Sequence, residues 1–390
     1  MRAGLALLCL AYVLSQFFRA FLAVLSTVLE RDIGAGPDDL AFASGLWFLA
    51  FAAMQLPVGW ALDRFGPRRT AGALLLVGGG GGAALFALAS APLHVSVAMA
   101  LIGVGCSPVL MASYYIFARQ FPPVQFATLA ALMLGVGSLG NLVAAWPMAL
   151  AAETVGWRAA LWGLAAISAG VALCIWLVLR DPPPADGKTR GSVFDLLKIA
   201  AIWPILPLMV VAYAPAAALR GLWAGPYLSD VFALSIVQVG QATLVMGVAM
   251  IAGTLVYGPL DRIFRTRKWV IFFGNLVALL GLAGLWAWAD AAVPVSVALL
   301  ALVGFFGASF PVIVAHGRSF FPDHLAGRGV TLLNLFGIGG VSAAQFITGP
   351  LHTVAGRDGA LAGHSAIFAF FALAVAVGLL VYLFSRDNMG

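Results

Sequence analysis

Charged residues are scarce in this sequence of 390 residues. Asp, Glu, Lys and Arg together make up only 9% of it, whereas 63% of the residues are hydrophobic. A soluble domain carries about 25% charged residues, so this chain could not cover itself with a surface suited to water. The shortage of charge leaves no room for a sizeable soluble domain and predicts a protein whose main solvent is lipid.

Groups that carry chemistry are also few. The three cysteines, Cys9, Cys106 and Cys174, all lie inside apolar runs, which argues against a disulfide framework. The sequence contains no Walker-type phosphate loop, no Cys/His metal cluster and no nucleophile–base arrangement. The basic residues behind the net charge of +6 are spread over short loops rather than gathered in a patch. We therefore expect no enzymatic activity, no cofactor, no metal and no nucleic-acid partner.

Twelve apolar segments, each about as long as a bilayer is thick, occupy most of the chain. They lie at 4–29, 38–61, 69–91, 94–119, 124–151, 157–179, 203–229, 236–260, 268–289, 293–316, 329–352 and 362–385. Each segment should be a helix, because in lipid the backbone groups must be satisfied within the segment itself. The sequence thus predicts an all-α membrane protein with twelve transmembrane helices.

The loops between these segments carry their Lys and Arg residues very unevenly. With the N-terminus in the cytoplasm, the inner side holds sixteen of them, and the outer side holds only Arg31, Arg158 and Arg357. Loops rich in Lys and Arg stay on the cytoplasmic side. We therefore predict a multi-pass protein of a bacterial-type inner (plasma) membrane, with both termini in the cytoplasm, and we expect a monomer in the lipid bilayer.

The two halves of the sequence repeat one another. Leu62-Asp63-Arg64 after the second segment recurs as Leu260-Asp261-Arg262 after the eighth, and Thr128-Leu129 recurs as Thr331-Leu332. A repeat in this order predicts two parallel, pseudo-symmetric six-helix bundles. We place them at 1–180 and 203–390, joined by a cytoplasmic linker at 181–202 that is rich in proline and polar residues.

The loop after the second segment carries a motif. It reads Gly59-Trp60-Ala61-Leu62-Asp63-Arg64-Phe65-Gly66-Pro67-Arg68-Arg69 and closely resembles the signature of the major facilitator superfamily. The resemblance implies a transporter fold in which Asp63, Arg64 and Arg68 form cytoplasmic charge contacts that hold one conformation. The second copy, with Asp261 and Arg262, is degenerate, because Gly258 is one residue closer to the aspartate and Phe264 replaces the second glycine. The alternative is a solvated loop that only marks topology.

Two arginines, Arg19 and Arg220, lie deep inside the first and seventh segments. A central arginine costs about 2.5–3.5 kcal/mol on insertion scales. No Asp or Glu lies in the middle of any segment to offset them. The pair therefore predicts a positively charged cavity that holds an anion between two planar guanidinium groups. The alternative is that helix carbonyls or water satisfy each arginine, which then only packs helices.

Short segments around these arginines resemble the organophosphate:phosphate antiporter branch of the superfamily. They are Tyr12 to Arg19, Ala218 to Leu222, Gly225 to Leu228 and Gly103 to Pro108. The resemblance implies that Arg19 and Arg220 hold a substrate phosphate. Ala20 stands where that branch carries a basic residue, so the expectation is a small organic anion bearing phosphate or carboxylate.

Polar and aromatic side chains at helical spacing extend the predicted site. They are Tyr12 and Gln16 in the first segment, Tyr114 and Tyr115 in the fourth, Trp223 and Tyr227 in the seventh, and Asn334 in the eleventh. Interhelical hydrogen bonds or interfacial aromatics would explain the same residues. His316, near the cytoplasmic end of the tenth segment, is a candidate for proton coupling or for a gate.

These observations predict a secondary active transporter of a small organic anion that works by alternating access, with Arg19 and Arg220 as the substrate clamp. Three alternatives stay open. They are a proton-coupled transporter of another small solute or drug, a copper importer that uses Met246 and Met250 as soft ligands, and a membrane sensor that binds an anion without transporting it.

Overall fold

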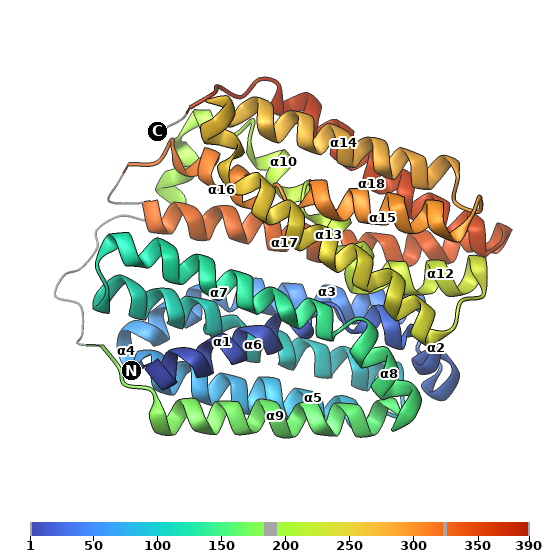
Figure 1. Cartoon of the computed structure of the whole chain (residues 1–390), viewed down its shortest axis with the longest axis horizontal. Helices are drawn as coiled ribbons and strands as arrows, with labels where there is room; N and C mark the ends of the chain where they lie inside the picture. The colour runs from blue at the N-terminus through green and yellow to red at the C-terminus, as the bar shows by residue number, and fades with distance from the viewer. Residues whose placement is uncertain (1, 183–192, 323–325, 389–390) are drawn as a thin grey trace. The chain divides into compact units, whose positions relative to one another are not determined.

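The computed structural model describes residues 2–182, 193–322 and 326–388 (Figure 1). Within these ranges all regular structure is helical. The chain divides into two compact units, one made of Met1–Asp186 with Ser235–Gln241 and the other of Gly187–Leu234 with Ala242–Gly390.

Unit 1 contains the helices that precede residue 183. They are α1 (Arg2–Phe17), α2 (Leu22–Ile33), α3 (Pro37–Ala53), α4 (Gln55–Leu74), the π-helix η1 (Leu75–Gly80), α5 (Gly81–Ala87), α6 (Pro92–Gln120), α7 (Pro123–Val143), α8 (Trp146–Thr154) and α9 (Trp157–Val178). Helix α1 packs on α6, α7 and α9, and α3 packs on α6. Helices α5 and α9 lie side by side (Figure 1).

Unit 2 contains the later helices, together with the part of α13 that follows residue 241. They are η2 (Val193–Lys198), η3 (Ala200–Ile202), α10 (Leu206–Val211), α11 (Ala214–Ala218), the π-helix η4 (Leu219–Trp223), α12 (Ala224–Phe232), α13 (Ile236–Phe264), α14 (Lys268–Ala287), α15 (Val293–Gly307), α16 (Phe310–Arg318), α17 (Ala326–Ala355), η6 (Gly356–Asp358) and α18 (Ala360–Tyr382). Helix α10 packs on α17 and α18, and α14 packs on α15 and α18.

In the described residues, ten helical segments are long and apolar enough to cross a membrane. The pair α1 and α2, bent by 54°, would be an eleventh. Helix α3 has 17 residues, at the lower limit for a span. Helix α4 is two helices that meet at Gly66, whose φ of 82° is not helical. The loop predicted after the second span therefore falls at a real break in the backbone.

The two units repeat one local contact. Gly140 of α7 lies against the carbonyl of Val13 in α1, and Gly340 of α17 lies against the carbonyl of Val210 in α10. A Cβ at either glycine would collide with that carbonyl, so only glycine allows so close an approach. Thr128 and Thr331 are 203 residues apart, and the same spacing pairs Gly137 with Gly340. The contacts instead pair Gly340 with Gly140, about one helical turn from Gly137.

Candidate functional site

Arg19 lies at a break in the first membrane segment. Helix α1 ends at Phe17 and α2 begins at Leu22, and the four residues between them form a turn. In this turn the Arg19 N–H donates to the Gln16 carbonyl at 3.3 Å, which is a three-residue rather than a helical step. The sequence predicted one continuous span over 4–29. The turn thus replaces helical hydrogen bonds with three-residue steps beside Arg19, and irregular backbone at membrane depth is tolerated where it lines a polar cavity or is buried in protein.

Two aromatic rings flank the Arg19 side chain. Its guanidinium carbon lies 5.1 Å from the centre of the Trp47 ring and 4.8 Å from that of Phe51. These rings stack on one another at 5.1 Å. The arrangement stabilises a cation through the ring faces. The aromatic pair was not predicted, although its i, i+4 spacing is visible in the sequence.

The Arg19 guanidinium keeps unused hydrogen-bonding capacity. Its Nε is buried and lacks a hydrogen-bond partner. Arg19 forms no ion pair with any residue that the structure describes. Within unit 1, a positive charge and a buried N–H group are thus left for another group to satisfy.

The other predicted residues of unit 1 separate into two groups. Gln16 donates a 2.9 Å hydrogen bond to the Tyr12 hydroxyl, and the Tyr12 ring packs against Gly137 of α7. The half-buried Tyr114 lies with its ring centre 6.3 Å from that of Phe117. Tyr115 instead lies under Arg119, whose guanidinium carbon is 3.6 Å from the centre of the Tyr115 ring. Tyr115 therefore belongs with the charged residues of the loop after the second segment.

Arg220 lies in the π-helical turn η4, between α11 and α12, and is only 3% exposed. A π-helical turn is rare and occurs often at functional sites. Pro215 and Pro226 flank this turn, and proline removes a helical hydrogen bond. Both predicted clamp arginines therefore lie where their helix is irregular, one in each unit.

Trp223 and Tyr227 use their polar atoms inside unit 2. The Trp223 indole N–H donates to Gln345 Oε1 at 3.1 Å and to Thr348 Oγ1 at 2.9 Å. The Tyr227 hydroxyl donates to the Ala289 carbonyl at 2.6 Å and lies 2.7 Å from Ser296 Oγ. These bonds tie the helix that follows Arg220 to α17 and to the start of α15.

Four further predicted residues of unit 2 have local surroundings of their own. Asn334 lies half-buried in α17. Both ring nitrogens of His316 are engaged, with the Arg386 carbonyl at 2.9 Å and the Tyr382 hydroxyl at 2.8 Å. Met246 and Met250 pack against Gly304 of α15, as expected for methionines that fill a helix interface.

The first loop motif forms a small charged cluster in unit 1. Arg119 of α6 lies 3.5 Å from the exposed Asp63 carboxylate. The Arg68 N–H donates to Asp181 Oδ1 at 2.7 Å. Asp181 thus caps the helix that starts after Gly66, as a carboxylate at a helix N-terminus does. The exposed Arg64 lies over the rings of Trp60 and Phe65.

The second copy of the motif is built in a similar way. Arg267 Nε donates to the Asp261 carboxylate at 3.2 Å. Arg262, the next residue after Asp261, is exposed. The Asp387 carboxylate accepts the N–H groups of Arg267 at 3.1 Å and Lys268 at 3.0 Å, and also the Thr266 hydroxyl. A left-handed backbone position falls on Arg265, with φ 52°, one residue after Phe264, which stands in place of the motif's second glycine.

The carboxylates Asp181 and Asp387 were missed from the sequence. Partial burial raises the pKa of Asp387, but its hydrogen bonds from Thr266, Lys268 and Arg267 outweigh that effect and hold the pKa below its usual value. The signal was present, because an Arg-Asp pair follows the last span of each half as Arg180-Asp181 and Arg386-Asp387.

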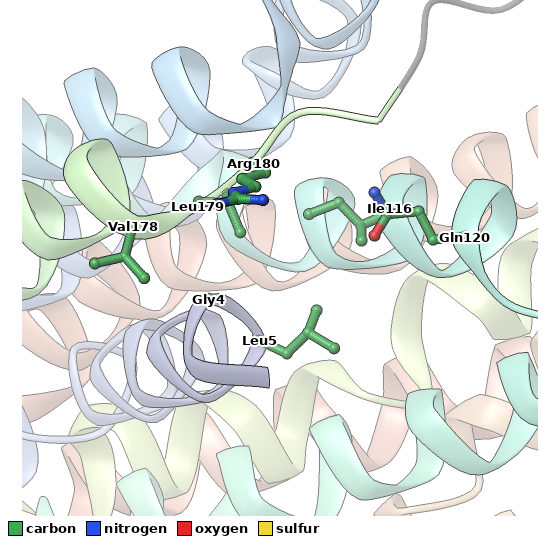
Figure 2. A pocket seen from close by; sticks show the side chains of 7 residues that line it. All are labelled: Gly4, Leu5, Ile116, Gln120, Val178, Leu179 and Arg180. Carbon is green, nitrogen blue, oxygen red and sulfur yellow. The ribbon is translucent and has the colours of Figure 1, made fainter. Parts of the chain in front are cut away.

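A pocket opens in unit 1 near the end of α9, and it contains no predicted site residue (Figure 2). Its walls come from α1, α6 and the end of α9, and they are mostly apolar apart from Gln120 and Arg180. It therefore lies apart from the surroundings of Arg19.

The Major Facilitator Superfamily model matches residues 8–222, more than half of the chain. The chain therefore belongs to the major facilitator superfamily, and it is a multi-pass membrane transporter rather than an enzyme. The predicted recognition of the superfamily is confirmed, whereas nothing singles out the organophosphate branch.

Two curated relatives are transporters of named compounds. The probable sulfoacetate transporter SauU of Cupriavidus necator is 23% identical over 299 residues, 72% of this chain and 69% of the relative. The 4-hydroxybenzoate transporter PcaK of Pseudomonas aeruginosa is 28% identical over 144 residues, and this match spans 37% of this chain and 32% of the relative.

Solved structures of other transporters share the fold. A bacterial homolog of the human lysosomal transporter Spinster, inward-facing and occupied, has a TM-score of 0.80 at 16% identity and covers 98% of this chain and 96% of its own. The D-xylose–proton symporter has a TM-score of 0.78 at 15% identity, with the same two coverages. At these identities the likeness shows the fold alone.

Proposed function

We propose that the chain is a secondary active transporter that moves a small organic anion across the inner membrane by alternating access. Arg19 and Arg220 clamp the anionic group of the substrate, and one half of the protein rocks against the other to open the site to either side. The observation that carries this proposal is that both arginines lie at interruptions of their helices, in a part of the membrane where charge is costly.

The helix interruptions beside the two arginines are typical of a transporter substrate site. In an unbroken apolar helix the backbone N–H and C=O groups bond to one another, so the helix interior offers no backbone group to a polar ligand. The turn at 18–21 and the π-turn η4 each depart from α-helical hydrogen bonding beside a guanidinium. Transporters of several folds place discontinuous helices at their substrate sites for this reason.

Charge balance favours an anion over other solutes. Arg19 has a buried Nε without a hydrogen-bond partner and forms no ion pair within the described residues. An oxyanion would accept hydrogen bonds from the guanidinium and offset its desolvation. A cation would be repelled, and a neutral solute would leave the charge uncompensated.

The relatives narrow the chemical class. Sulfoacetate and 4-hydroxybenzoate, the compounds in their names, are both small organic anions. A carboxylate or a sulfonate presents two or three oxygens that a guanidinium can bind at once. We therefore take carboxylates and sulfonates as the first class of candidate substrates, ahead of phosphate esters.

The remaining site residues take supporting roles. Tyr12, Gln16, Tyr114 and Asn334 line the substrate path with polar groups. Trp223 at the end of η4 and Tyr227 in α12 shape it, and their hydrogen bonds keep this segment in place. Tyr115 acts through Arg119 at the loop motif instead.

The two loop motifs form the cytoplasmic gates. Asp63, Arg64 and Arg68 hold one conformation through contacts with Arg119 and Asp181, and Asp261 and Arg262 do the same more weakly in the second half. His316, through its bonds to Arg386 and Tyr382, takes part in the second gate, and proton coupling is its alternative role.

The architecture that goes with this function is two six-helix bundles, 1–180 and 203–390, with twelve spans and both termini in the cytoplasm. Counting α3 with the first part of α4, up to Gly66, as one span gives the twelve. Residues 183–192 of the predicted linker 181–202 lie outside the described residues. A reporter inserted near Gly356 should be accessible from outside, and a cytoplasmic signal there would overturn the topology.

A thermal-shift screen of the purified protein tests the substrate class, because a ligand that binds only the folded state raises its melting temperature. The panel holds sulfoacetate, 4-hydroxybenzoate, a phosphate ester and a matched neutral amide. We expect stabilisation by one or both of the first two and none by the amide. Stabilisation by the amide alone would refute the anion site.

A further inference from the structure

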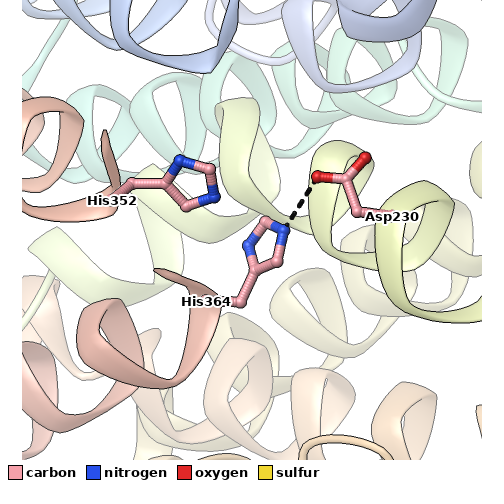
Figure 3. Close-up of side chains that lie close together, drawn as sticks. All are labelled: Asp230, His352 and His364. Carbon is pink, nitrogen blue, oxygen red and sulfur yellow. Dashed lines mark hydrogen bonds and ion pairs between the residues drawn. The ribbon is translucent and has the colours of Figure 1, made fainter. Parts of the chain in front are cut away.

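Three ionisable side chains converge in unit 2, at the ends of three helices (Figure 3). They are Asp230 in α12, His352 near the end of α17 and His364 near the start of α18. One candidate donor atom from each lies within 4.8 Å of the others. Neither histidine belongs to the arginine site or to the loop motifs.

The carboxylate fixes the proton on one of the two imidazoles. His364 Nε2 lies 3.0 Å from Asp230 Oδ2. A carboxylate only accepts hydrogen bonds, so Nε2 carries the hydrogen and Nδ1 is left with a lone pair. His364 is 1% exposed in its side chain, whereas that of Asp230 is 34% exposed.

The lone pair of His364 points at the second histidine. Figure 3 shows the Nδ1 side of His364 facing a ring nitrogen of His352, and the ring centres lie 4.6 Å apart. His364 Nδ1 and His352 Nε2 are both buried and have no hydrogen-bond partner. Burying two ring nitrogens that face one another without a hydrogen bond costs free energy, unless a third group binds both of them.

We propose that His352 and His364 bind a divalent transition-metal ion of the Zn²⁺ type, with Asp230 as the residue that orients His364. Imidazole nitrogens suit Zn²⁺, Cu²⁺ and Ni²⁺. A metal-bound histidine usually donates its other ring N–H to a carboxylate, which is the arrangement of His364 and Asp230. The rings of Trp223, 5.1 Å from His352, and Tyr227, 5.6 Å from His364, form an apolar wall beside the ion.

The geometry needs only a small adjustment. Two nitrogens on one tetrahedral Zn²⁺ lie about 3.3 Å apart, since each Zn–N bond is about 2.0–2.1 Å. One ligand atom of each residue lies within 4.8 Å of the others, so small side-chain rotations would bring two imidazole nitrogens to that spacing. Water supplies the remaining ligands through the exposed side of Asp230. The ion would tie α12, and with it the helix that carries Arg220, to α17 and α18.

Zn²⁺ titration of the purified full-length protein, stripped with a chelator and measured against a chromophoric competitor, tests the site. We expect one Zn²⁺ per chain and a rise in melting temperature with Zn²⁺. His364→Gln keeps a donor toward Asp230 but lacks the Nδ1 ligand, and it should weaken binding at least 100-fold, as should His352→Gln. Asp230→Asn should weaken it about 10- to 100-fold.

Two controls make the outcome decisive. The exposed His94, which is bonded to Ser90 in unit 1, provides His94→Gln, which should bind Zn²⁺ like the unaltered protein. Melting temperatures without metal show whether each variant is folded. Absence of stoichiometric binding to the unaltered protein would overturn the proposal, and so would folded His352→Gln and His364→Gln proteins that bind Zn²⁺ as tightly. If His94→Gln lost as much Zn²⁺ affinity as the other two variants, the ion would be bound by unspecific imidazole contacts and the proposed site would be wrong.

Discussion

Gly66→Ala should destabilise unit 1 through two separate effects. Gly66 has φ 82°, and a side chain in the left-handed region costs about 1–2 kcal/mol. An added Cβ would also lie 2.5–2.8 Å from the carboxylate atoms of Asp181. That carboxylate accepts the Arg68 N–H and would be displaced, with the loss of a helix cap worth about 1 kcal/mol.

The two effects together amount to about 2–3 kcal/mol, which for a domain of about 150–250 residues lowers the melting temperature by roughly 4–12 °C. Thermal unfolding of the purified variants in one detergent measures the shift. Gly163→Ala in α9 is the matched control, because nothing lies within 4 Å of the added Cβ and its φ is ordinary. It should be neutral or slightly stabilising.

Asp181→Ala separates the strain from the lost cap. Alone it should cost about 1 kcal/mol. In the Gly66→Ala background it should cost almost nothing, because the carboxylate is already displaced. Fully additive losses, or a Gly66→Ala protein as stable as Gly163→Ala, would refute the account of this turn.

Three further predictions concern the charged and buried groups. The pKa of Asp387 is lowered in the folded state, so its contribution to stability is complete above the unfolded pKa of about 3.9 and is lost as the pH falls through the folded pKa. The difference in unfolding free energy between the unaltered protein and Asp387→Asn, measured by urea unfolding from pH 6 to 3, should stay constant above about pH 5 and shrink below it. A difference that grows toward acid pH would contradict this prediction. Asp63→Asn should slow transport in proteoliposomes while equilibrium binding stays intact, and unchanged flux would leave the loop as a topological marker only. Tyr227→Phe should lower stability by about 1–3 kcal/mol, because the Ala289 carbonyl loses its buried donor, with little change in substrate affinity; a large affinity loss without destabilisation would place the hydroxyl on the substrate.

The sequence predicted the features that depend on composition and spacing. Long apolar runs can only be helices in lipid, and the motif from Gly59 to Arg69 identified the superfamily. The position of the loop motif agrees with the backbone break at Gly66, because a glycine beside a proline has few other roles there.

The break at Arg19 could not be predicted in the same way. Residues 17–21 contain neither glycine nor proline, so no local signal ends the helix. The rings of Phe17, Phe18 and Phe21 pack on one another across the turn, and the Phe21 ring also packs on that of Phe86 in α5, 5.4 Å away. Such a contact between distant residues leaves no signal in the local sequence. At Arg220 the flanking prolines gave a hint, but a π-turn also depends on the neighbouring helices.

Contacts between distant residues were beyond the sequence for a different reason. Asp230 and His364 are 134 residues apart, and a pair at such a separation leaves no periodic signal. The same holds for Asp181 beside Arg68, although the repeated Arg-Asp pairs were visible once the halves had been aligned.

The arginine clamp is tested most directly by the affinity of Arg19→Lys and Arg220→Lys for the anion that the thermal-shift screen selects, measured by calorimetry on purified protein. Lysine keeps the positive charge but lacks the planar guanidinium that binds two oxygens at once. Each variant should therefore lose one charged hydrogen bond, worth about 1.5–3 kcal/mol, and its Kd should rise roughly 10- to 150-fold. Arg31→Lys, at an exposed arginine paired with Asp32, should bind like the unaltered protein. Near-normal affinity in both Arg19→Lys and Arg220→Lys would contradict the clamp.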